Sequence, residues 1–146
     1  MTTTMVLDKR INAPTWLKMA AAIGVLWYAY GLLQFFLAYS MEPSAAVAAG
    51  DITAAHGAAI LQTPMFVWLC FAIASGAGLL GSFLMFSRSS AAKPAFAISL
   101  ASATIYYGWI YLVSGTGADR PSEELIIAGV VIFVTLSFFV LSLRKT

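Results

Sequence analysis

Charged residues, histidine and cysteine are all scarce in this sequence. Asp, Glu, Lys and Arg together make up 10% of its 146 residues, whereas a soluble domain carries about a quarter. Histidine and cysteine occur once each, as His56 and Cys70. A lone cysteine excludes a disulfide within the chain, and these two residues fall short of the ligand set of a structural zinc site. We therefore expect no metal and no other cofactor, and we interpret Cys70 as a small packing residue.

The sequence is instead rich in long apolar runs, and hydrophobic residues make up 61% of the chain. Four runs cover residues 15–39, 64–86, 94–113 and 124–143. Each reaches the length of about 20 residues that a helix needs to cross a bilayer, and Lys18, near the start of the first run, can extend its ammonium group to the interface. Backbone amides in lipid must be paired within their own segment. We therefore predict an all-α, integral membrane four-helix bundle that forms a single transmembrane domain over residues 1–146.

Basic residues are distributed unevenly between the two sides of the predicted bundle. Of the eight Lys and Arg residues, Arg120 alone lies on one side. The others are Lys9, Arg10, Lys18, Arg88, Lys93, Arg144 and Lys145. Since loops rich in Lys and Arg stay in the cytoplasm, we predict that both termini and the turn 87–93 are cytoplasmic and that the loops 40–63 and 114–123 face outward. This basic excess is a topology signal, and we expect the bilayer, not a nucleic acid, as the partner.

Small residues recur on one face of each of the first two predicted helices. Gly24 and Gly31 lie two turns apart on the first, and Ala74, Gly78 and Gly81 belong to two small-xxx-small series on the second. Such faces let helices approach closely in a membrane. We interpret them as packing surfaces, used either inside the bundle or against another membrane protein or a second copy of the chain.

Aromatic residues gather in the predicted outer half of the bundle, together with Gln34, the one side-chain amide in any run core. Tyr and Trp collect at membrane interfaces without any ligand, and a glutamine there typically forms an interhelical hydrogen bond. The alternative is a small-molecule pocket, in which aromatic walls combine with a few polar groups. The candidate ligand-binding residues are Trp27, Gln34, Trp68, Ser102, Tyr106 and Trp109. The serines of the third helix are expected to bond back to their own helix.

The segment GDITAAHGAAILQTP, residues 50–64, lies between the first two runs and carries His56. Asp51 can cap a short helix whose weak apolar side includes Ala59 and Ile60. We predict an extramembrane helix that lies across the outer ends of the bundle and stops at Pro64. A lone histidine without a second metal ligand is expected to be exposed and without a role. The segment is therefore interpreted as a connector that also caps the bundle.

The stretch TPMFVWLCFAIASGAGLLGSFLMFSRSSAAKPAFAISL, residues 63–100, contains a Pro, a Phe-Ala pair, spaced glycines and a basic turn, followed by Pro, Phe and Ser-Leu. Together with NAPTWLK, residues 12–18, it resembles a group of small bacterial four-span proteins of poorly defined function, often labelled sugar transporters. The resemblance implies a bacterial inner-membrane protein of four helices. It assigns no catalytic or binding residue.

The run cores exclude two classes of function. An enzyme needs an acid, a base, a nucleophile or a metal set, and a transporter driven by a proton or ion gradient normally needs an ionisable residue inside the membrane. The central parts of the four runs contain neither such a catalytic set nor an Asp, Glu, Lys, Arg or His. We therefore expect a non-catalytic protein. Two classes remain. An accessory subunit that packs against a larger membrane complex is favoured narrowly by the small-residue faces, and a binder or uncoupled carrier of a small molecule or lipid is the alternative.

Overall fold

The structure, a computed structural model, describes residues 14–144 and is all-α over this range. Its long helices are α2 (Thr15–Ser40), α5 (Met65–Phe86), α6 (Ala92–Gly108) and α7 (Ser122–Leu143). A π-helical turn, η1 (Trp109–Val113), extends α6. Within the described residues these make four helices that are long and apolar enough to cross a membrane. The prediction of an all-α, four-helix membrane bundle is therefore confirmed.

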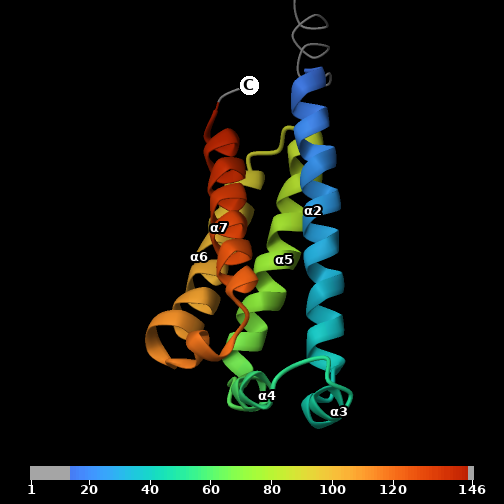
Figure 1. Cartoon of the computed structure of the whole chain (residues 1–146). Coiled ribbons are helices and arrows are strands. Elements are labelled where there is room, and N and C mark those ends of the chain that lie inside the picture. The colour runs from blue at the N-terminus through green and yellow to red at the C-terminus, as the bar shows by residue number, and fades with distance from the viewer. Residues whose placement is uncertain (1–13, 145–146) are drawn as a thin grey trace, which may run out of the picture.

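The helices pack in chain order, α2 on α5, α5 on α6 and α6 on α7 (Figure 1). The described chain begins and ends at the same end of the bundle, which we call the terminal end and which also holds the turn 87–91. The opposite end, the loop end, carries the short helices α3 (Pro43–Ala48) and α4 (Ala54–Leu61) and the 3-10 turn η2 (Thr116–Asp119). Lys18, Arg88, Lys93 and Arg144 belong to the terminal end and Arg120 to the loop end, whereas Lys9, Arg10 and Lys145 lie outside the described residues.

Proline marks the start of each long helix, as the sequence predicts. Pro14, Pro64 and Pro121 each immediately precede the first helical residue, and Pro94 lies in the first turn of α6. Proline is tolerated at these positions because the first N–H groups of a helix have no partner within it. Two helices begin earlier than the apolar pattern indicates: α6 starts at Ala92 and α7 at Ser122.

The connection between α2 and α5 holds two short helices where the sequence predicted one. Gly50 has a φ of 81°, a conformation that glycine adopts readily, and it separates α3 from α4. The cap of α4 is Thr53, whose Oγ1 accepts a hydrogen bond from the backbone N–H of His56 (3.1 Å). The prediction that Asp51 caps this helix is wrong, because Asp51 lies in the turn two residues before the cap position.

The closely packed core lies in the half of the bundle nearer the terminal end. The ring of Tyr28 lies 6.2 Å from that of Phe96 and 6.0 Å from that of Phe138, centroid to centroid, and Phe96 stacks on Phe138 at 5.5 Å. Leu17 and Met85 complete this cluster toward the terminal end. The three rings fill the space between α2, α6 and α7 there, and the less filled half of the bundle lies toward the loop end.

Candidate functional site

A cavity of about 120 Å³ lies between the four long helices, on the loop-end side of the aromatic core. Every one of these helices contributes to its lining: α2 with Trp27 and Gly31, α5 with Phe71, α6 with Ala103 and α7 with Val131. These residues make its walls almost entirely apolar. A cavity bounded by four separate helices is a candidate binding site because each helix can present a different group to one ligand.

Hydroxyl groups form the floor of this cavity. The Tyr28 hydroxyl, on α2, donates to Thr135 Oγ1 on α7 (3.0 Å). Ser99 Oγ, on α6, donates to the carbonyl oxygen of Ala74 on α5 (2.6 Å). These bonds join α2 to α7 and α6 to α5 near the middle of the spans. Ser75 is also buried and lines the cavity, and it makes no hydrogen bond among residues 14–144. The floor therefore offers one hydroxyl that residues 14–144 leave without a hydrogen bond.

The cavity opens sideways, between α2 and α7. Its rim includes Tyr30 and Gln34 of α2 and Ile127 of α7, all of them exposed. Gln34 Nε2 donates to the Tyr30 hydroxyl (2.6 Å) on the same helix. Backbone packing between α2 and α7 is slight compared with that of the helix pairs adjacent in the chain. Because α2 and α7 both span the membrane, this opening faces the lipid tails.

The structure separates the predicted ligand-binding residues into two groups. Trp27, Gln34 and Tyr106 line the cavity, and the Tyr106 ring lies 4.9 Å from that of Phe71, centroid to centroid. The other three do not line it. Trp68 packs against Tyr39 with ring centroids 5.7 Å apart, Trp109 packs against Phe66 at 6.4 Å, and Ser102 is buried in α6.

Two hydrogen-bond predictions are wrong. Gln34 was expected to bond to another helix, but its amide donates to the Tyr30 hydroxyl one turn earlier on α2. Ser99 was expected to bond back to its own helix, but it crosses to α5, the neighbour on which α6 packs most extensively. The sequence analysis also missed Tyr28, Ser75 and Thr135. Their hydroxyls stood in runs that were treated as uniformly apolar, and no face of the fourth run was assigned.

The predicted small-residue faces pack inside the chain. A Cβ at Gly24 would meet Phe138 at 3.1 Å, and one at Gly31 would meet Ser75 Oγ at 3.0 Å. On α5, Gly78 lies against the ring of Tyr28, Gly81 lies against Phe96, and Ala74 is buried. These surfaces hold α2 to α5 and α5 to α6. They are therefore not open to a partner protein.

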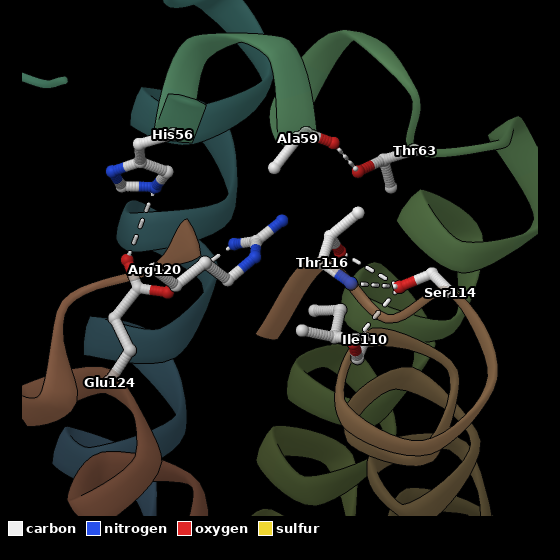
Figure 2. A network of polar contacts seen from close by, with 8 residues as sticks. All are labelled: His56, Ala59, Thr63, Ile110, Ser114, Thr116, Arg120 and Glu124. Carbon is white, nitrogen blue, oxygen red and sulfur yellow. Dashed lines mark hydrogen bonds and ion pairs between the residues drawn. The ribbon is translucent and has the colours of Figure 1, made fainter. Parts of the chain in front are cut away.

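His56 is buried, and the expectation that it is exposed is wrong (Figure 2). The helix α4 lies across the loop end and points this ring at the start of α7, where His56 Nε2 lies 3.5 Å from Glu124 Oε1. Arg120 Nη1 lies 3.3 Å from Glu124 Oε2. Arg120 is also largely buried, and its Nε has no hydrogen-bond partner within residues 14–144. This cluster of one carboxylate with two basic side chains ties α4 to α7.

No group of three or more His, Cys, Asp and Glu residues that could hold a metal ion occurs in the described part of the chain. No protein-family model matches this chain. No match was found among curated proteins or solved structures either. Three features of the described structure bear on function: the cavity, the faces that pack inside the bundle and the charges at the two ends of the spans.

Proposed function

We propose that this polytopic membrane protein is non-catalytic and binds a small apolar molecule, or the apolar part of a lipid, in the cavity between its four helices. One observation carries the proposal: the cavity opens between α2 and α7 toward the lipid. An apolar molecule dissolved in the bilayer can reach it without crossing water. The resemblance to small bacterial four-span proteins supports a place in the bacterial inner membrane.

The size and chemistry of the cavity indicate which class of ligand it takes. An engineered cavity of about 150 Å³ with apolar walls, in another protein, stays dry and binds benzene. A cavity of about 120 Å³ therefore suits a ring, an isoprene unit or a short piece of an acyl chain, with the rest of the molecule lying among the lipid tails. The free Ser75 hydroxyl can give one hydrogen bond. A sugar would bury many hydroxyls with too few partners, and that burial is costly.

The accessory-subunit hypothesis loses the observation that favoured it. That hypothesis relied on Gly24, Gly31, Gly78 and Gly81 as surfaces for a larger complex, and each of them packs against another helix of the same chain. Binding needs no free glycine face. We therefore favour the ligand-binding function over the accessory-subunit function, whereas the sequence alone narrowly favoured the accessory subunit.

Filling the cavity tests the proposal. Ala103 is 2% exposed and lines the cavity, whereas Ala101, on the same helix, is exposed. We expect protein purified from native membranes in mild detergent to retain an apolar molecule, measured by solvent extraction and mass spectrometry. Ala103→Leu should reduce the retained amount by about tenfold, which corresponds to about 1.4 kcal/mol of binding free energy. Ala101→Leu makes the same change of side chain and should retain as much as the wild type. Equal retention by the two variants would contradict binding in the cavity.

The membrane orientation is a separate proposal, supported by the basic residues at the terminal end. We propose that the terminal end is cytoplasmic and the loop end faces outward. In a Cys70→Ala background, a membrane-impermeant thiol reagent added to sealed cells should label Ala48→Cys and leave Ser90→Cys unlabelled. Both positions are exposed, so accessibility in opened cells serves as the control. Labelling of Ser90→Cys in sealed cells would reverse the orientation.

A further inference from the structure

The terminal end carries an open cleft of about 390 Å³ that the proposed function does not use. It lies between the turn that joins α5 to α6 and the end of α7. Arg88, Lys93 and Arg144 lie along it, and the half-buried Leu141 and the exposed Leu143 add apolar surface to its lining. A cleft that combines cationic groups with accessible apolar side chains, placed where the spans end, suits a molecule that has an anionic part and a hydrocarbon part.

The charge at this end is one-sided in the described part of the chain. Every acidic residue within 14–144 belongs to the loop end or its connections. They are Glu42, Asp51, Asp119, Glu123 and Glu124. Helix dipoles do not alter this balance, because α2 and α6 begin at the terminal end while α5 and α7 finish there, and their partial charges of about half a unit each cancel. Lys93 and Arg144 therefore give the cleft a net positive charge.

The start of α6 adds one backbone donor to the cleft. Ala92 and Lys93 are the first two residues of α6, and both line the cleft. The Ala92 N–H already donates to the carbonyl oxygen of Ser89 (3.2 Å), and Pro94 has no N–H, so the Lys93 N–H is the donor that these three residues leave available within residues 14–144. The helix has no side-chain cap and no acidic residue in its first turn. Backbone N–H groups at such an end attract anions, phosphate among them. This end differs from the start of α7, where Glu123 and Glu124 occupy the first turn.

We propose that this cleft binds the phosphate headgroup of an anionic phospholipid, with its acyl chains running along the outer surface of the bundle. Basic pockets between membrane helices bind such headgroups. A free phosphate ion would neutralise the cations and leave the side chains of Leu141 and Leu143 uncovered. A phospholipid covers both, and the membrane brings it to this depth.

The test uses the full chain in detergent, titrated with dioctanoyl phosphatidylglycerol and, in parallel, with dioctanoyl phosphatidylcholine. We expect the anionic lipid to bind more tightly. Lys93→Gln should weaken its binding by about fivefold and the double variant Lys93→Gln/Arg144→Gln by about thirtyfold, the factors for one and two charges near a membrane surface. Lys18→Gln is the matched control. It removes the same charge at the same end from an exposed side chain that does not line the cleft, and it should change binding by less than about twofold.

Three results would overturn the proposal. Equal affinity for the two lipids would show that the headgroup charge is not recognised. An equal loss in Lys18→Gln and Lys93→Gln would assign binding to diffuse surface charge. Displacement of the lipid by inorganic phosphate at similar concentrations would assign the cleft to a free anion. Lys93 is exposed, so the single variant is expected to keep the wild-type unfolding temperature, and that measurement accompanies each titration.

Discussion

Replacing Gly78 by alanine should lower the free energy of unfolding by about 1–3 kcal/mol, the usual range for an overpacked core position. A Cβ at this position would overlap the ring of Tyr28. That ring cannot move aside freely, because it contacts Phe96 and Phe138 and its hydroxyl bonds to Thr135. Relieving the overlap must therefore disturb α2, α6 and α7 together. Gly78→Leu should have a still larger effect.

Gly76, on the same helix, provides the matched control. A Cβ at Gly76 would meet no atom within 4 Å, so Gly76→Ala should leave stability unchanged or raise it slightly, since alanine favours a helix over glycine. Thermal or denaturant unfolding of the detergent-solubilised protein measures both variants. Equal stability of Gly78→Ala and Gly76→Ala would mean that α2 and α5 do not pack as closely as the structure has them.

The positions of the spans could be predicted from the sequence to within one or two residues. The runs 15–39 and 64–86 correspond to Thr15–Ser40 and Met65–Phe86, and the runs 94–113 and 124–143 correspond to Ala92–Val113 and Ser122–Leu143. This signal is local: a bilayer demands about 20 apolar residues in sequence, whatever surrounds them. Pro14, Pro64 and Pro121 sharpen the boundaries for the same local reason.

The rotation of each helix about its axis was harder to predict. In a membrane the lipid-facing side is as apolar as the core, so hydrophobicity does not distinguish the two. Small residues carry that information where they occur, and Gly24, Gly31 and Gly78 do face neighbouring helices. The fourth run offered no comparable pattern to the sequence analysis, and Thr135 was missed. Tyr28 was missed for the same reason, because its part in the cavity floor depends on the hydrogen bond between its hydroxyl and Thr135.

His56 was misjudged because its partner lies far away in the chain. The expectation of an exposed histidine rested on the lack of a second metal ligand, and the distance in sequence from His56 to Glu124 concealed their pairing. Only the position of α4 across the loop end brings the two together. The amphipathic side of α4 indicated a helix lying on the bundle and did not indicate which side chains meet beneath it.

Replacing Glu124 by alanine should destabilise the loop end and raise hydrogen exchange in α4. The change leaves two largely buried basic side chains without their shared carboxylate: His56 and Arg120, whose side chains are 10% and 8% exposed. Removing one partner of a fully buried pair costs about 3–5 kcal/mol. The Glu124 side chain is 36% exposed, and solvent screening reduces the effect. We therefore expect a loss of about 1–3 kcal/mol in the free energy of unfolding, within the range for leaving a buried polar group without its hydrogen-bond partner.

Glu123→Ala separates this cluster from the general effect of a negative charge at the start of α7. Glu123 and Glu124 both lie in the first turn of α7, where a carboxylate interacts favourably with the helix dipole. Glu123 is exposed, so its replacement removes that dipole interaction and leaves His56 and Arg120 paired with Glu124. Hydrogen exchange of residues 54–61 should rise in Glu124→Ala and stay at the wild-type level in Glu123→Ala. If the two variants behaved alike, the dipole alone would account for the effect, and the pairing of His56 and Arg120 with Glu124 would not be what holds α4 against the bundle.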